Sequence, residues 1–217
     1  MPAPTSGWSP AADRILRTAA ELIAERGYAA TSTRTIASAI GVAQPAIYKH
    51  FSTKNDILSA LVGLGVGRPL ELAGELARVS APAIVKLHRW LRESLEHFRD
   101  SPYVLVAILT TPELYQENFA AERELIRQFD GVVVDFVRAA QNEGDVRAMK
   151  PESGARLVIA LFDVLAVPEY QVSPAEIVDF AFTGLLADPA RLPEIRAAAD
   201  ALEPAGIDGD AVVNAID

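Results

Sequence analysis

Apolar side chains recur at helical spacing along most of the chain. The first such face predicts a helix over residues 10–26, which Ser9-Pro10 would begin and Gly27 would end in the left-handed conformation. Two short helices follow, the second over residues 44–50, with a tight break at Gly41-Val42-Ala43 between them. Short helices joined by a glycine turn are typical of a helix-turn-helix unit.

Downstream, the apolar pattern stays helical and predicts an all-α body. The expected segments are a helix over 54–78 that Gly63, Gly65, Gly67 and Pro69 interrupt, a helix over 82–99, a short apolar segment over 102–110, one long helix from Thr111-Pro112 to Gly144, and helices over 152–166 and 174–187. The helix over 152–166 is apolar on nearly every side, so all of its surface must be covered. Because this helix lies near the end of a short chain, a second subunit is its natural cover.

Charge divides the chain into a basic head and an acidic body. The formal net charge is −9, but residues 1–56 hold six Lys/Arg and four Asp/Glu, whereas residues 57–217 hold fourteen and twenty-five. DNA would repel the acidic body, so DNA contact is expected only on the head. The expected domains are a flexible N-terminal tail over 1–8, a helix-turn-helix domain over 9–56, a helical body over 57–203 and an acidic C-terminal tail over 204–217.

Composition excludes several classes of protein. Half of the 217 residues are hydrophobic, which is typical of a globular chain with a sizeable core. The chain has no cysteine, so disulfides, cysteine-bound zinc, iron–sulfur clusters and thiol nucleophiles are excluded. The sequence has no run of about 18 apolar residues that could span a membrane. It also does not begin with a basic stretch followed by an apolar one, as a signal peptide would. We therefore expect a cytoplasmic protein.

The most specific signal lies between residues 31 and 54. It consists of Thr31-Ser32-Thr33-Arg34-Thr35-Ile36-Ala37, Gly41-Val42, Ile47-Tyr48-Lys49-His50-Phe51 and Lys54. This set resembles the tetracycline-repressor (TetR) family of bacterial transcriptional regulators. The resemblance covers residues 10–60 closely and the remainder only as an all-helical body of the right length. It implies an all-α homodimer with an N-terminal three-helix DNA-binding domain and a C-terminal ligand-binding and dimerisation domain. The implied partners are operator DNA, a second copy of the chain and a small molecule, with no cofactor.

The recognition helix is expected to present Gln44-Pro45-Ala46 to the major groove. A glutamine amide can form a bidentate pair with adenine, and an alanine methyl can meet a thymine methyl. Two residues depart from the family pattern, since Ala43 stands where a small hydroxyl residue is usual and Pro45 where a small residue, often glycine, is usual. The expected DNA-contacting residues are Thr33, Arg34, Gln44, Pro45, Ala46, Tyr48, Lys49, His50 and Lys54. The alternative for Tyr48 and His50 is simple packing against the first helix.

The body offers candidate ligand and dimer residues by resemblance and helical spacing. The expected wall of an apolar pocket comprises His88, Leu91, Phe98, Tyr103, Leu109, Tyr115, Phe119, Phe136 and Phe162. The expected dimer interface comprises Leu157, Leu161, Leu165, Ile177, Phe180 and Leu185. The alternative for the aromatic members is ordinary core packing. His88 is expected to be a hydrogen-bonded core or pocket histidine, and it cannot share a metal ion with His97, nine residues later on the opposite helix face.

Enzyme signatures are missing from the sequence. Neither H-E-x-x-H nor G-x-S-x-G occurs, and the glycines at 63, 65 and 67 fit no phosphate-binding motif. We therefore expect a ligand-responsive transcriptional regulator, and a repressor is the more common outcome in the family. Two alternatives remain open: a ligand-independent protein that organises DNA, and a small-molecule carrier that has lost DNA binding.

Overall fold

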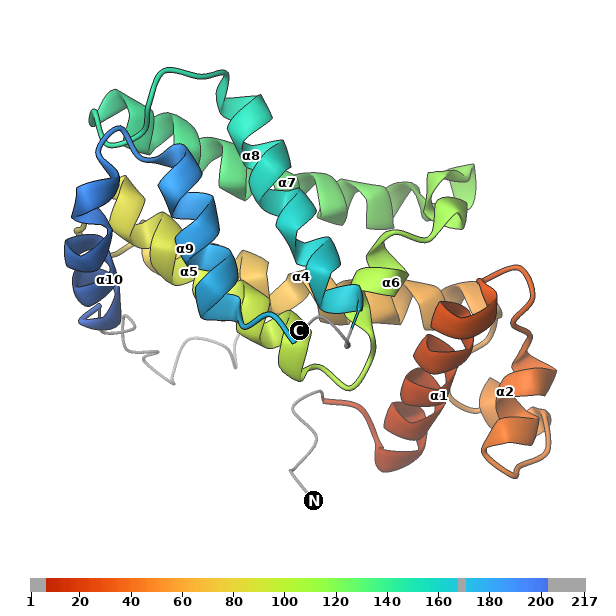
Figure 1. Ribbon diagram of the computed structural model, residues 1–217. Helices are drawn as coiled ribbons and strands as arrows, with labels where there is room; N and C mark the ends of the chain where they lie inside the picture. Colours follow the sequence, from red (N-terminus) through yellow and green to blue (C-terminus); the bar gives the residue numbers. More distant parts are fainter. Residues whose placement is uncertain (1–6, 168–170, 203–217) are drawn as a thin grey trace, which may run out of the picture.

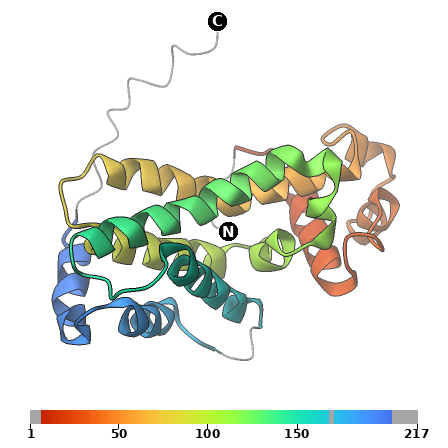
Figure 2. The same ribbon diagram turned by 90° about the horizontal axis from the view of Figure 1, so that it is seen from above.

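The structure is a computed structural model that describes residues 7–167 and 171–202. Helices make up both parts, and the head (α1 to α3) lies at one end of a larger helical body (Figures 1 and 2). The helices are α1 (Pro10–Arg26), α2 (Thr33–Ala39), α3 (Pro45–Tyr48), α4 (Lys54–Ala77), α5 (Ala83–Asp100), α6 (Leu105–Leu109), η1 (Pro112–Tyr115), η2 (Glu117–Phe119), α7 (Ala120–Asn142), α8 (Pro151–Ala160), η3 (Leu161–Ala166), α9 (Pro174–Leu185), η5 (Pro189–Arg191) and α10 (Leu192–Asp200). This confirms the predicted all-α fold with an N-terminal helix-turn-helix.

The head forms because its caps and apolar positions agree. Ser9 caps α1 by accepting a hydrogen bond from the amide of Ala12, as predicted. Gly27 ends the helix at a φ of 82°, but its ψ of 159° lies outside the left-handed helical region. Trp8 was expected in a loose tail, yet its ring packs 5.5 Å from that of Phe51. The other residues of the expected tails, 1–6 and 204–217, lie outside the described residues.

Helix α4 connects the head to the body as one continuous helix, so the predicted interruption is wrong. Gly65 is buried against α6, and a Cβ atom added there would touch the Leu109 side chain at 3.4 Å. Pro69 lies inside the helix, where its carbonyl accepts a hydrogen bond of 2.8 Å from the indole of Trp90. By length and composition α4 is apolar enough to cross a membrane, but side chains such as Leu61 and Val66 are fully buried in the protein core. The buried face of α4 thus packs against α6 at Gly65.

The long helix predicted from residue 112 begins at Ala120 instead. Two 3-10 turns, η1 and η2, precede it, and the extended backbone of Gln116 separates them. The guanidinium of Arg123 donates to the carbonyls of Leu114 and Gln116, which holds this bent segment against the first turn of α7. Similarly, the helix predicted over 152–166 is α-helical only to Ala160 and continues as a 3-10 helix.

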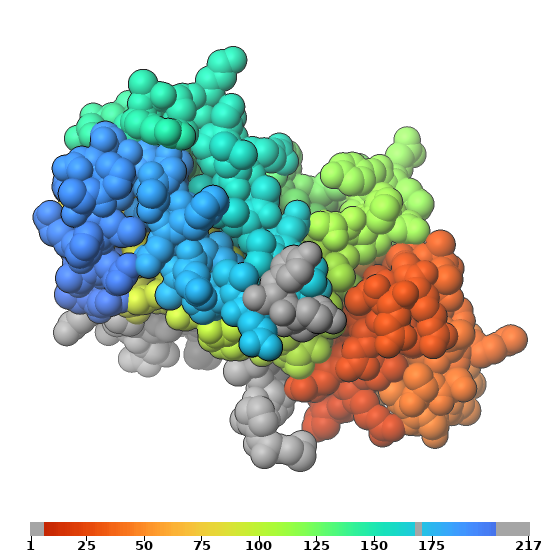
Figure 3. Space-filling view, viewed as in Figure 1, coloured from red at the N-terminus to blue at the C-terminus, as the bar shows by residue number. Residues whose placement is uncertain are grey.

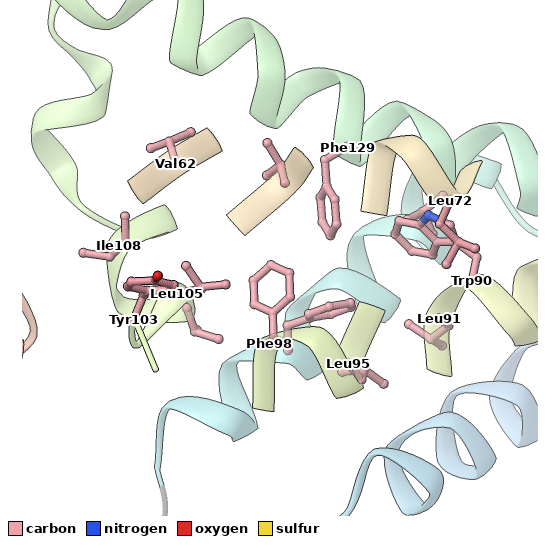
Figure 4. Close-up of a cluster of buried hydrophobic side chains, with 14 of the residues drawn as sticks. Val62, Leu72, Trp90, Leu91, Leu95, Phe98, Tyr103, Leu105, Ile108 and Phe129 are labelled. Carbon is pink, nitrogen blue, oxygen red and sulfur yellow. The ribbon is translucent and has the colours of Figure 1, made fainter. Parts of the chain in front are cut away.

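Aromatic side chains fill the middle of the body. The ring of Phe162 on η3 lies 5.1 Å from that of Phe98 on α5 and 5.8 Å from that of Phe129 on α7. Trp90 extends the cluster, 5.3 Å from Phe129. Figure 4 shows Phe98, Phe129 and Trp90 directed into the space between the helices. These contacts join α5, α7 and η3 into one core.

Candidate nucleic-acid interface

The predicted DNA-contacting residues lie on the outer side of the head, on α2, α3 and the start of α4. Arg34, Pro45, Tyr48, Lys49 and His50 have exposed side chains. Gln44, Ala46 and Lys54 are half-buried, and Thr33 is buried. Tyr48, which is 48% exposed, and His50 are both exposed, so neither side chain is buried against the first helix. Both side chains are therefore accessible to DNA.

Helix α3 is short and begins with a proline. Pro45 occupies its first position, where the missing amide hydrogen has no intrahelical partner. Ile47 is completely buried and fixes the helix on the head, which leaves Tyr48 and Lys49 facing outward. The turn that would enter the major groove therefore consists of Gln44, Pro45 and Ala46, as the sequence predicts.

The side chain of Gln44 is held by two hydroxyl groups. Its amide nitrogen donates to the Thr33 hydroxyl at 2.9 Å and to the Tyr48 hydroxyl at 2.8 Å. The two hydroxyl groups lie 3.2 Å apart and share a further hydrogen bond. A primary amide has two N–H donors, so both are in use. A bidentate pair with adenine, as expected above, requires this amide to leave at least one hydroxyl group.

Lys54 is fixed at the first position of α4. Its ammonium group donates to the carbonyl of Tyr28 at 2.8 Å and lies 3.8 Å from the centre of the Tyr28 ring. Burial lowers the pKa of Lys54, and the nearby charge of Glu113 opposes this shift. Burial, followed by the charges of Glu113 and Asp56, raises the pKa of Tyr28 to about 12. A cation placed on a ring at a helix N-terminus is well suited to hold a phosphate.

A hollow of about 420 Å³ lies beside these side chains. Its lining comprises Ala29, Thr31, Ser32, Thr33, Tyr48, Ser52, Thr53 and Lys54. The groups in it are hydroxyls and one ammonium group, which are the groups that contact the sugar-phosphate backbone in protein–DNA complexes. The hollow therefore brings Thr33, Tyr48 and Lys54 into one phosphate-compatible surface, with Arg34, Lys49 and His50 on neighbouring exposed positions of α2 and the α3 turn.

The expected pocket residues divide into three groups. Leu91, Phe98 and Phe162 are buried in the body core, and Phe136 and Leu109 pack against it. Tyr115 is 83% exposed, so its inclusion in an apolar wall is wrong. Tyr103 and Phe119 instead contact the head: the Tyr103 hydroxyl donates to Asp13, and the Phe119 ring meets that of Tyr28 edge-on at 6.1 Å.

His88 is buried without a hydrogen bond. Its side chain is 1% exposed, and neither ring nitrogen has a partner among the described residues. The expectation of a hydrogen-bonded histidine is therefore wrong, because the neighbour on α9 is the ring of Phe182, at 5.0 Å. Within residues 7–167 and 171–202, no group of three His, Asp or Glu side chains is arranged to hold a metal ion.

The contacts between head and body were not predicted from the sequence. Arg17 pairs with Asp13 at 2.7 Å and lies 5.7 Å from the centre of the Tyr103 ring, so three side chains join α1 to the loop before α6. Asp13 and Tyr103 are 90 positions apart, and no local pattern marks such a pair. These contacts connect α1 of the head to the body.

The expected dimer residues are only partly available for an interface. Leu157 on α8 is 67% exposed and Phe180 on α9 is 71% exposed. Leu161 and Leu165 are half-buried. Ile177 and Leu185 are buried in the core of the protomer, so their assignment to the interface is wrong. The sequence shows that both residues are apolar, but it does not show which face of α9 turns inward. Helices α8 and α9 lie on the same face of the body, which Figure 3 shows from outside.

Comparisons with known proteins agree with this geometry. The model of the family "Bacterial regulatory proteins, tetR family" matches residues 15–61, which cover most of the head. The structure of AmtR from Mycobacterium smegmatis is 31% identical and superposes with a TM-score of 0.74, covering 93% of this chain and 100% of AmtR. AibR, solved with isovaleryl coenzyme A and operator DNA, is 22% identical, covers 80% of this chain and 96% of its own, and has a TM-score of 0.67, which shows a shared fold.

A curated relative from Bacillus subtilis matches about half of the chain. The regulator YerO, described as an uncharacterized helix-turn-helix transcriptional regulator, is 29% identical over 121 residues, which are 54% of this chain and 39% of YerO. The chain thus spans well under two thirds of that relative's length. The full-length match to AmtR, together with the family model over residues 15–61, leads to one conclusion: this chain belongs to the TetR family of bacterial regulatory proteins.

Proposed function

We propose that this TetR-family regulator represses transcription by binding a near-palindromic operator as a dimer, and that a small apolar or aromatic molecule releases it. The observation that carries the DNA-binding part is the surface formed by Gln44, Tyr48, Thr33 and Lys54 around the phosphate-compatible hollow. This surface lies on the basic head, which forms one end of the molecule, and the acidic body forms the remainder.

The proposed two-fold operator follows from the proposed dimer. Helices α8 and α9 each carry an exposed apolar side chain, Leu157 and Phe180, and small residues such as Ala160 and Gly184 are exposed on the same helices. If α8 and α9 pack against the same helices of a second copy, both side chains are buried. The second copy then also covers the apolar helix over 152–166, as the sequence analysis expected. Two heads of such a dimer enter successive major grooves when they lie about 34–36 Å apart, which predicts a two-fold operator.

Ligand release follows from linkage. The contacts of Asp13 with Tyr103 and of Tyr28 with Phe119 transmit a shift of the body to the head. A ligand that binds best to a conformation with a different distance between the two heads weakens DNA binding. DNA weakens ligand binding by the same factor. A coupling free energy of about 1–3 kcal/mol corresponds to a factor of about 5 to 150. The isovaleryl coenzyme A bound to AibR supports a small-molecule signal for this fold.

One observation favours a second candidate, a DNA-binding protein that needs no ligand. The rings of Phe98, Phe129 and Phe162 pack on one another, so a molecule entering there must separate them. Under this candidate the body would serve for dimerisation alone.

The decisive experiment is fluorescence anisotropy on the DNA beside the gene for this chain, with random DNA as control, across a salt series. Selective, salt-dependent binding by a dimer supports the regulator. A screen of acyl thioesters, fatty acids and aromatic acids against that complex then separates the two candidates, since release by one compound establishes ligand control. Equal, weak binding to all DNA segments tested contradicts the proposal.

Replacing Gln44 by alanine tests base reading. We expect the variant to lose about 1–3 kcal/mol on the selected operator and little on random DNA, because a glutamine that pairs with a base contributes only at its own sequence. Anisotropy titrations on both DNA molecules measure this. A loss of the same size on random DNA would show that Gln44 does not read a base.

Replacing Lys54 by alanine tests the phosphate contact. The variant should weaken binding to both DNA molecules alike and reduce the slope of log K against log salt by about 1, since one fewer phosphate is neutralised. Lys86, a half-buried lysine on α5 in the body, provides the matched control as Lys86→Ala. An unchanged slope in the Lys54 variant removes this residue from the phosphate contacts.

A further inference from the structure

The segment formed by η1 and η2 reaches from the body to the head. The guanidinium of Arg123, on α7, donates to the carbonyls of Leu114 and Gln116 and so holds this segment on the body. At the end of the segment, the Phe119 side chain is 1% exposed. Its ring meets the ring of Tyr28 edge-on, with 6.1 Å between the ring centres. The η1–η2 segment therefore contacts the head through this aromatic pair.

Tyr28 also supports the ammonium group of Lys54. That group donates to the Tyr28 carbonyl at 2.8 Å and lies 3.8 Å from the centre of the Tyr28 ring. The far end of the tyrosine is fixed as well, because its hydroxyl donates to Asn55 on α4. An ammonium group has three N–H donors, so the bond to the carbonyl leaves donors for a phosphate. Phe119, Tyr28 and Lys54 thus form a continuous series of contacts from the body to the phosphate-compatible hollow.

A carboxylate of the same segment acts on this series of contacts. Burial lowers the pKa of Lys54, and the charge of Glu113 on η1 opposes that shift. The same charge adds to burial in raising the pKa of Tyr28 to about 12. A phosphate bound to Lys54 brings a further negative charge into the range of Glu113, and like charges repel. The segment therefore carries one side chain that steadies the ammonium group and one that opposes its ligand.

We propose that the η1–η2 segment of the body sets how tightly Lys54 holds a DNA phosphate. Phe119 is a positioning residue: it fixes the Tyr28 ring and so keeps the ammonium group ordered before DNA binds, which reduces the side-chain entropy lost on binding. Glu113 works in the opposite direction, because its charge repels the phosphate. A movement of this segment against the head changes the affinity for every DNA sequence, since phosphate contacts carry no sequence information. This regulation rests on the proposed DNA-binding function.

Replacing Phe119 by leucine tests the positioning role. Phe119→Leu should weaken binding to random DNA and to the selected operator alike, by about threefold, which is within the cost of ordering one long side chain. The slope of log K against log salt should stay that of the wild type, because the phosphate is still neutralised. In a Lys54→Ala background the same change should have no effect on either DNA molecule.

The matched control for this variant is Phe129→Leu. It removes the same atoms from a buried ring of the body that packs on Phe98 and Phe162. Both DNA affinities should stay at the wild-type value in this control. Thermal melts verify that the two leucine variants fold.

Replacing Glu113 by glutamine tests the charge. Glu113→Gln should tighten binding to both DNA molecules about twofold at low salt, and the gain should shrink as salt screens the repulsion. The gain should also be lost in the Lys54→Ala background. Glu117→Gln, a change at an exposed carboxylate on η2 of the same segment, is the matched control and should leave both affinities unchanged.

The outcomes separate this inference from the proposed function. Random DNA suffices for both cycles, because the Lys54 contact is independent of sequence. Opposite effects of Phe119→Leu and Glu113→Gln that are both lost without Lys54 support the inference. A Phe119→Leu effect of the same size with and without Lys54, or a Glu113→Gln variant that behaves as Glu117→Gln does, overturns it and leaves the regulator intact. A wild-type protein that binds the operator and random DNA equally contradicts the proposed function instead.

Discussion

Replacing Phe180 by aspartate should convert the dimer to a monomer and weaken operator binding by at least about 100-fold. The side chain is 71% exposed on α9, and an aromatic anchor at the centre of an interface commonly contributes several kcal/mol. An aspartate there would be buried without a partner in the dimer, which adds the cost of desolvating a charge. Sedimentation velocity measures the oligomeric state, and anisotropy measures the operator affinity.

Tyr115→Asp is the matched control for this variant. Tyr115 is an aromatic side chain that is 83% exposed, but it lies on η1, away from α8 and α9. We expect that control to remain dimeric and to bind the operator as the wild type does. A Phe180→Asp protein that stays dimeric would place the interface on another face.

Buried His88 should make the protein less stable as the pH falls from about 6.5 to 4. Burial lowers the pKa of His88 to about 4; the charges of Arg92 and Arg196 add to this shift, and those of Asp200 and Asp179 oppose it. The folded protein thus holds this ring neutral, whereas the unfolded chain takes up a proton below its ordinary pKa of 6.5. The stability is fully present above that pH and falls by up to about 3 kcal/mol as the pH approaches 4.

Comparison of the wild type with His88→Leu isolates this contribution. Leucine has a similar size and no polar atom, and it removes two ring nitrogens that have no partner among the described residues, so the variant should be at least as stable at pH 7.5. Urea denaturation at pH 7.5 and pH 5 should show a smaller loss of unfolding free energy for the variant than for the wild type. His50→Gln, a change at an exposed histidine on the head, controls for loss of one histidine. Equal pH dependence in wild type and His88→Leu would contradict the assignment.

The sequence predicted the head more completely than the body, for physical reasons. In the head, the Ser9 cap and the glycine turn at Gly41 act over short distances, and both appear in the structure. In the body, the apolar stripe through Tyr115 and Phe119 correctly indicated a helix but placed its start eight residues too early. Its true start depends on Arg123, which binds carbonyls of the preceding turns, and a periodic pattern does not reveal this contact.

The side-chain network of the recognition surface shows a similar division. The identities of Gln44, Tyr48 and Thr33 were predicted as DNA-contacting residues from the motif. Their mutual hydrogen bonds were not, because Thr33 is 15 positions from Tyr48 and only the turn between α2 and α3 brings them together. Likewise, the apolar character of Ile177 and Phe180 was evident, but which of them faces inward depends on how α9 packs against α5.

The Asp13–Tyr103 and Tyr28–Phe119 contacts have a practical consequence for building chimeric biosensors. Engineers who exchange recognition modules between regulators would cut this chain between α3 and α4, near residue 53. A transplanted head would then leave behind the Tyr103 phenol, which donates a hydrogen bond to Asp13, and the Phe119 ring, which meets the Tyr28 ring edge-on. We therefore expect a working graft to carry Tyr103 and Phe119 along with the head and Lys54, so that the exchangeable unit is discontinuous in the gene.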